Sequence, residues 1–127
     1  MNDLDRRIVA VDLFVALSNV AVGGMLSTVA FAPALRWLVP PLAVGIALLT
    51  AAADRSQRGV WLLTGFAVLV TVGIGWGMVT DRISLGILPV LLLCLGIGSA
   101  ANRVLFGVYY PVPDVRRRRE RDGSVGD

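Results

Sequence analysis

Four apolar stretches occupy most of this 127-residue chain, and their lengths constrain its fold more than any other feature. A helix needs roughly 20 apolar residues to cross a bilayer core about 30 Å thick. Three stretches reach that length, and the second, with 17 residues, lies at the short end of the usual range. The pattern predicts an all-α, polytopic membrane protein built as an antiparallel bundle of four transmembrane helices. The predicted spans are residues 8–32, 37–53, 60–79 and 83–108.

Composition also favours a membrane location over a soluble domain. Hydrophobic residues make up 56% of the chain, and the mean hydropathy is +0.75, which exceeds that of ordinary soluble domains. The first stretch is expected to be retained, because about 25 apolar residues exceed the core of a cleavable signal peptide. We expect one transmembrane domain over residues 1–110. After Pro111 and Pro113 the composition is charged, which predicts a disordered basic cytoplasmic tail over residues 111–127.

The distribution of arginine predicts the orientation of the bundle. All twelve basic residues are arginine. The predicted connections are short, so consecutive helices are antiparallel and both termini share a side with the connection at residues 54–59. Nine arginines fall on that side and only two, Arg36 and Arg82, on the other. The positive-inside rule therefore predicts a cell-membrane protein with both termini cytoplasmic. Aromatic residues placed near the two predicted interfaces agree with this: Trp61, Tyr109 and Tyr110 at one, Trp37 and Trp76 at the other.

Two charged residues fall inside the predicted spans. Asp12 lies about one turn inside the first span, and Arg103 lies one to two turns inside the fourth, so their depths agree within roughly 3–5 Å. The sequence therefore predicts an Asp12–Arg103 ion pair between the two helices. Three roles stay open at this point. The pair fixes packing, or Arg103 extends to the headgroups instead, or Asp12 is a proton- or cation-coupling carboxylate.

Small and polar residues recur at helical spacing in the first and fourth spans. They predict a polar track along the first helix and close contacts between helices. The track consists of Ser18, Asn19, Ser27 and Thr28. The packing positions are Gly23, Gly96 and Ala100, together with Gly73, Gly75 and Gly77 in the third span. Pro89, about two turns into the fourth span, is expected to kink that helix.

Four short helices, an acidic residue in the first and glycines in the third resemble the small multidrug resistance exporters. The stretch from Trp76-Gly77 through Arg82 and Leu85 to Asn102 is compatible with that pattern. The resemblance implies a carboxylate contested by protons and cationic drugs. The family's aromatic and proline signature is absent from Leu48–Gly65, the acidic residue is Asp12 rather than glutamate, and the arginine bias opposes a dual orientation. We therefore assign the chain to no family.

The reactive side chains needed for an enzyme are missing. The chain contains no histidine and a single cysteine, Cys94, so neither a catalytic constellation nor a cofactor or metal site is predicted. The sequence favours a structural or accessory subunit that packs with itself or with a larger membrane partner. The alternative is a small oligomeric transporter or proton-coupled channel that uses Asp12. The arginine run Arg116, Arg117, Arg118 and Arg119 is expected to contact anionic lipid rather than nucleic acid.

Overall fold

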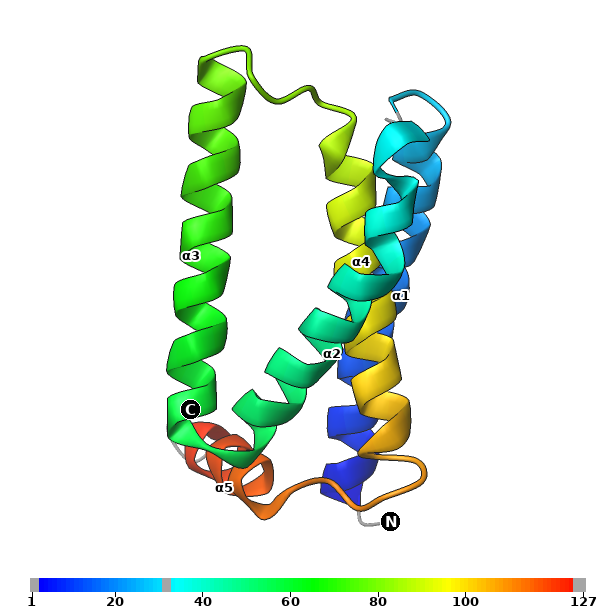
Figure 1. Cartoon of the computed structure of the whole chain (residues 1–127). Helices are drawn as coiled ribbons and strands as arrows, with labels where there is room; N and C mark the ends of the chain where they lie inside the picture. The colour runs from blue at the N-terminus through cyan, green and yellow to red at the C-terminus, as the bar shows by residue number, and fades with distance from the viewer. Residues whose placement is uncertain (1–2, 31–32, 125–127) are drawn as a thin grey trace.

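The computed structural model describes residues 3–30 and 33–124, and these residues form an all-α protein. Four long helices are followed by one short helix (Figure 1). The helices are α1 (Asp3–Ser27), α2 (Val39–Arg55), α3 (Gln57–Val79), α4 (Ile87–Leu105) and α5 (Asp114–Ser124), with a 3-10 helix, η1 (Pro33–Leu38), before α2.

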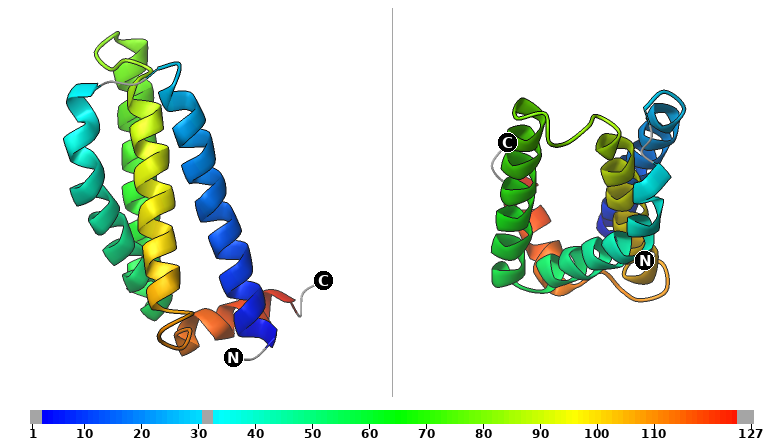
Figure 2. Two further views of the ribbon diagram at one scale, coloured as in Figure 1. Left: turned by 90° about the vertical axis from the view of Figure 1, so that its right-hand side faces the viewer. Right: turned by 45° about the horizontal axis from the view of Figure 1, so that its top comes forward.

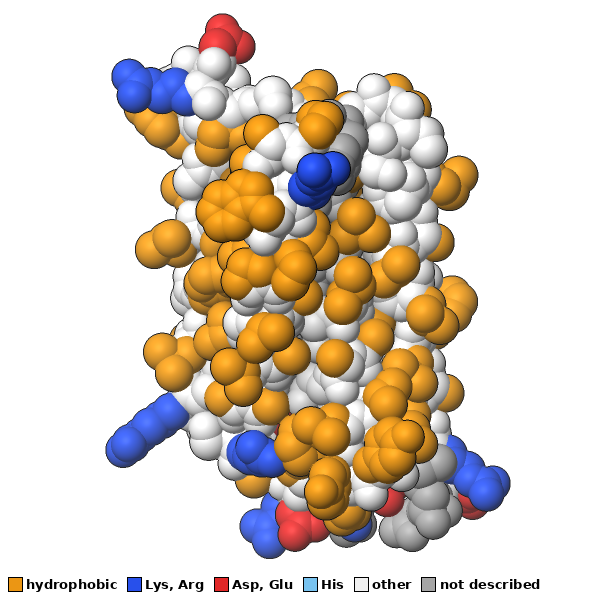
Figure 3. Space-filling view, turned by 45° about the vertical axis from the view of Figure 1, so that its right-hand side comes forward, with side chains coloured by type: hydrophobic (Ala, Val, Ile, Leu, Met, Phe, Trp, Pro, Cys, Tyr) orange, Lys and Arg blue, Asp and Glu red, His pale blue; other side chains and the backbone are white. Residues whose placement is uncertain are grey.

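The four long helices are each long and apolar enough to cross a membrane, as α1, η1 with α2, α3 and α4. They alternate in direction, so the start of α1 and the whole of α5 lie at the same end of the bundle (Figure 1). Hydrophobic side chains cover the middle of the face drawn in Figure 3, and charged side chains lie at its two ends. The prediction of an all-α bundle of four apolar, membrane-length helices is confirmed.

The observed helix ends differ from the predicted spans where polar residues continue a helix. α1 begins at Asp3 rather than at residue 8, and Asp3 and Asp5 occupy its first turn, where carboxylates are stabilised by the helix dipole. The connection predicted over residues 54–59 shrinks to Ser56, the only non-helical residue between α2 and α3. The Ser56 hydroxyl accepts a hydrogen bond from the Gly59 N–H at 2.9 Å and so caps α3.

The fourth helix begins later than the sequence predicts. Residues 80–86 form turns, in which Asp81 adopts a φ of 54°, and α4 starts at Ile87. Pro89 therefore lies in the first turn of α4 and not two turns inside it. The N–H groups in the first turn of a helix have no intrahelical acceptor, so a proline at this position removes no helical hydrogen bond. The physical basis for the predicted kink is thus absent.

The long helices are unequally packed. α4 lies between α1 and α2, whereas α3 packs mainly against α2 (Figure 2). Within the most apolar part of each helix, 39% of the residues of α4 are buried, against only 6% of those of α3. α3 therefore presents nearly all of its apolar surface away from the rest of the chain.

The segment after α4 differs from the predicted disordered tail. Val112 is buried with Ile8 and Val9, and residues Asp114–Ser124 form α5, which crosses the end of the bundle (Figure 2). Composition predicts disorder for so polar a segment, because such a segment buries too little apolar surface to order itself. The reason for the difference is that arginines of α5 find polar partners on α1 and α2.

Candidate functional site

A cluster of buried and partly buried charged side chains lies where α1, α2 and α4 converge near α5. The guanidinium of Arg103 in α4 is 2.5 Å from an oxygen of Asp12 in α1 and 3.1 Å from an oxygen of Asp54 in α2. Only 6% of the Arg103 side chain is exposed. The structure thus brings together Asp12 and Arg103, the two residues predicted to pair, and adds a second carboxylate. A single arginine links three helices.

Asp54 is the site residue that the sequence interpretation missed. The predicted second span ended at residue 53, which placed Asp54 in a connection. In the structure α2 continues to Arg55, so the Asp54 side chain is directed into the bundle and is buried. The amide of Asn102 donates a further hydrogen bond to Asp54 at 3.2 Å. The sequence did contain a signal for this residue. Asp54 directly follows an apolar stretch, and its expected depth in the membrane matches that of Arg103.

The charges of this cluster compensate one another. A buried guanidinium without a counter-charge would be strongly unfavourable, and Asp12 and Asp54 provide that counter-charge. Arg116 of α5 approaches the second oxygen of Asp12 at 3.5 Å, and Arg103 also donates to the Phe106 carbonyl at 3.4 Å. Through its contacts with both carboxylates, Arg103 connects α4 to α1 and to α2 and holds the three helices in one register.

The charged cluster lines a cavity of about 350 Å³. All five helices contribute to its walls, which combine charged, hydroxyl and apolar groups. The lining residues are Asp12, Val15, Ala16, Thr50, Ala53, Asp54, Val60, Leu63, Ser99, Asn102, Arg103, Arg116 and Arg119. Among the described residues, no group of three or more His, Cys, Asp or Glu side chains is placed to hold a metal ion.

The predicted polar track in α1 is not a continuous path. Each of its four polar side chains donates to a carbonyl of its own helix, as hydroxyl and amide groups often do within helices. The bonds run from Ser18 to Phe14, from Asn19 to Val15, from Ser27 to Gly24 and from Thr28 to Met25, at 2.6–3.0 Å. These side chains are therefore satisfied locally and do not line the charged cavity.

Two of the predicted packing glycines lie at close contacts between α1 and α4. A Cβ at Gly96 would lie 2.6 Å from the Ala16 carbonyl, and one at Gly23 would lie 3.1 Å from side-chain atoms of Leu92 and Leu93. Ala100 is half-buried on α4. Gly98, which the sequence interpretation did not single out, performs the same role toward α2, where a Cβ would approach the Ala43 carbonyl at 2.5 Å.

The predicted packing role of the α3 glycines is wrong within this chain. A Cβ at Gly73 or Gly75 would meet no atom within 4 Å, and a Cβ at Gly77 would meet the side chain of Ile83 rather than another long helix. The reason is that α3 lies apart from α1 and α4. The spacing of small residues shows that they share one face of a helix. It does not show which neighbouring helix, if any, that face contacts.

A second, larger cavity follows from the position of α3. It has a volume of about 590 Å³ and lies between α2, α3 and α4. Its walls are almost entirely apolar, and all lining residues except Thr71 have hydrophobic or glycine side chains. They are Pro41, Leu42, Gly45, Ile46 and Leu49 of α2, Leu63, Phe66, Ala67, Val70, Thr71 and Ile74 of α3, and Leu88, Leu91, Cys94 and Leu95 of α4. We call this cavity the apolar groove.

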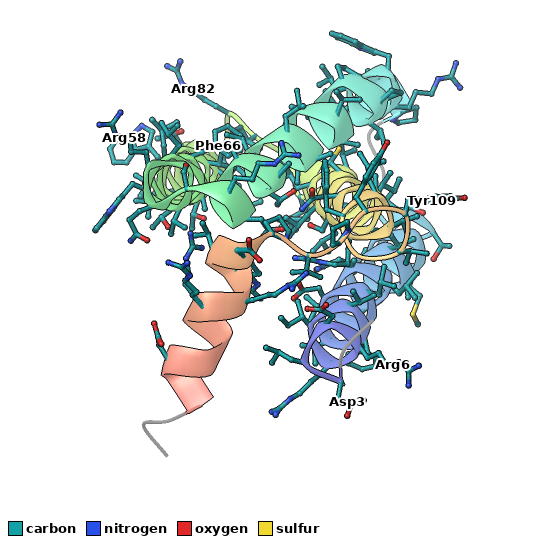
Figure 4. All side chains as sticks on the ribbon, turned by 90° about the horizontal axis from the view of Figure 1, so that it is seen from below. Asp3, Arg6, Arg58, Phe66, Arg82 and Tyr109 are labelled. Carbon is teal, nitrogen blue, oxygen red and sulfur yellow. The ribbon has the colours of Figure 1, made fainter. Side chains whose placement is uncertain are left out.

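The arginine run lies in α5, at the end of the bundle seen in Figure 4. Arg116, Arg117 and Arg119 contact α1 or α2, whereas Arg118 is exposed.

Comparison of the chain with protein-family models, curated proteins and solved structures finds no match. The functional proposal therefore rests on the charged cluster, the apolar groove and the position of α3.

Proposed function

We propose that this protein is a small structural or accessory subunit of a membrane assembly, and that a transmembrane helix of its partner packs in the apolar groove. The observation that carries the proposal is the isolation of α3. This helix packs mainly against α2, and it leaves about 590 Å³ of apolar space between itself and the α2–α4 pair. In lipid no hydrophobic driving force brings helices together. A helix would therefore bind in this groove through close van der Waals packing.

Glycines with open space around them, one of which lines the groove, support a helix as the occupant. Gly45 lines the groove, and a Cβ at this position would meet no atom within 4 Å, as is also true of Gly73 and Gly75 on α3. Glycine weakens a helix interior by roughly 0.5–1 kcal/mol relative to alanine. Contacts inside this chain do not explain these three glycines. Close approach of a helix from another chain does, because small residues permit such contacts.

The charged cluster supports the same proposal over the transport alternative. Proton or cation coupling needs a carboxylate that changes partners, whereas Asp12 and Asp54 share Arg103 within the bundle. The α1 hydroxyls that would have extended a polar path donate to their own helix instead. A transporter that uses Asp12 is therefore the second candidate, and its motivation is the charged cavity alone.

The test is the mass of the particle extracted from native membranes in a mild detergent. We expect a particle larger than a single chain, containing either a second polypeptide or further copies of this one. Gly45→Leu places a branched side chain in the apolar groove and should reduce the larger particle about tenfold, because the partner helix then meets that side chain.

Gly24→Leu is the matched control. Gly24 lies on α1, outside the groove, and it also has open space around its Cβ position. This variant should leave the particle unchanged. A single-chain particle for the unsubstituted protein, or equal behaviour of the two variants, would contradict the proposal.

A further inference from the structure

The short helix α5 is docked on the bundle by polar contacts rather than by hydrophobic burial. Its sequence begins Asp-Val-Arg-Arg-Arg-Arg, and Val115, its one apolar residue, is 37% exposed. Val112, two residues before α5, is buried against α1 and tethers the segment. Figure 4 shows α5 running out from the bundle, on the side between α1 and α3. What holds this helix in place is therefore the set of contacts made by its arginines.

Three of the four consecutive arginines reach different parts of the bundle. Arg117 lies 3.1 Å from the buried carboxylate of Asp5, and Arg116 lies 3.5 Å from Asp12. Arg119 donates to the carbonyls of Ala53 and Ser56, at 2.9 Å and 3.3 Å. These last contacts satisfy carbonyl groups at the C-terminal end of α2, where a cation is also favoured by the helix dipole.

The fourth arginine points elsewhere because of helical geometry. Successive residues of an α-helix are about 100° apart, so positions 116, 117 and 119 share one side and position 118 lies opposite. Arg118 is accordingly exposed. The run therefore contains three docking arginines and one with the same charge that does not dock.

α5 also forms one wall of the charged cavity. Arg116 and Arg119 line it together with residues of α1, α2, α3 and α4. Movement of α5 away from the bundle would remove both side chains and open the cavity, including Asp12, toward the aqueous phase. The docking contacts are only partly sheltered, since the side chains of Arg116 and Arg117 are 29% and 22% exposed.

We propose that α5 is an electrostatic latch over the charged cavity, and that an anionic bilayer surface releases it. Partly exposed ion pairs are weak individually and sensitive to competing charge. Phosphate groups of anionic lipids offer each arginine an alternative acceptor, and juxtamembrane arginines are attracted to such lipids. The exposed aromatic residues Trp61, Tyr109 and Tyr110 occur near this end of the bundle, which suits the level of the headgroups. The latch concerns a single chain and does not depend on a partner in the apolar groove.

The experiment measures the distance between spin labels on α5 and α3. The labels are attached to Asp122→Cys and Gln57→Cys, both exposed positions, with Cys94→Ser removing the native thiol. We expect one narrow distance distribution in nanodiscs of phosphatidylcholine, and a second, longer and broader population when phosphatidylglycerol is included. Inorganic phosphate added at constant ionic strength to phosphatidylcholine nanodiscs should not produce this population, which distinguishes a lipid surface from the free ion.

Neutral substitutions test the assignment of individual arginines. Arg117→Gln or Arg119→Gln should raise the ratio of undocked to docked α5 about two- to fivefold in phosphatidylcholine, as loss of one partly exposed contact predicts. Arg118→Gln makes the same change of charge without a docking contact and should leave the ratio unchanged. An identical distribution in the two lipid compositions overturns the proposal, as does a release by Arg118→Gln equal to that by Arg119→Gln. The lipid comparison needs no arginine variant, so it decides even if a variant fails to fold.

Discussion

At the scale of single residues, Arg103 is the position on which the most interactions depend. Its guanidinium holds carboxylates from α1 and α2 and is almost completely buried. If an apolar side chain replaced it, Asp54 would lose the arginine that faces it, and Asp12 would retain the longer contact with Arg116, at 3.5 Å. The two losses would not be independent, because the three groups share one network.

Arg103→Leu should therefore destabilise the protein by about 3–5 kcal/mol, the cost of leaving buried charge unpaired. Adding Asp12→Asn and Asp54→Asn to the same chain should restore most of that loss, since the stranded charges are then removed. Unfolding of the purified protein in detergent by increasing denaturant measures both effects. Arg82→Leu, at an exposed position on the opposite end, is the control and should change stability by less than about 0.5 kcal/mol. A triple variant no more stable than Arg103→Leu would exclude the shared network.

At the scale of helices, glycines separate the packed pairs from the isolated helix. Gly96 lies where α4 meets α1, and a Cβ there would be 2.6 Å from a backbone carbonyl and 2.8 Å from the backbone nitrogen of Val20. Gly73 of α3 has open space at the same position. The same substitution therefore has opposite expected effects at the two sites.

Gly96→Ala should cost about 1–3 kcal/mol, because rigid backbone atoms have to move apart. Gly73→Ala should leave stability unchanged or raise it by up to about 1 kcal/mol through helix propensity. The midpoints of thermal unfolding of the two purified variants in detergent, each compared with the unsubstituted protein, measure both effects. Equal losses would mean that α3 is packed in the single chain, contrary to the structure.

At the scale of the whole molecule, charge is distributed unequally between the two ends of the bundle. The described start of α1 and all of α5 lie at one end (Figure 1), and that end carries nine of the twelve arginines. The opposite end carries Arg36 and Arg82. Because translocation of arginine is disfavoured, this asymmetry predicts a single orientation in the membrane.

We expect the arginine-rich end to be cytoplasmic. With Cys94→Ser as the background, a thiol at Asp122→Cys should react with a membrane-impermeant maleimide only after the cells are opened. A thiol at Ser84→Cys, in the turn between α3 and α4, should react in intact cells. The reverse pattern, or labelling of both positions in intact cells, would refute this orientation.

The number of long helices and their approximate bounds were predictable from the amino-acid sequence alone. Apolar run length is a local property, and it decides whether a helix can cross a bilayer. Asp12 and Arg103 were also identifiable from the sequence, because a charged residue inside an apolar run needs a partner. The rise per residue of a helix gives the depth of each residue in the membrane, and the two depths agree. Helix ends were less predictable. α1 and α2 continue through Asp5 and Asp54, since charged residues extend a helix when the bundle provides partners for them.

Which helices contact one another could not be predicted from the sequence and follows from the folded bundle. Periodicity marks Gly73 and Gly96 alike as small, yet one faces open space and the other faces α1. The inclusion of Asp54 in the charged cluster and the docking of α5 likewise depend on contacts between distant segments. Composition alone predicted disorder for α5. The arginines of α5 find their acceptors, the carboxylate of Asp5 and the carbonyls of Ala53 and Ser56, only in the folded bundle.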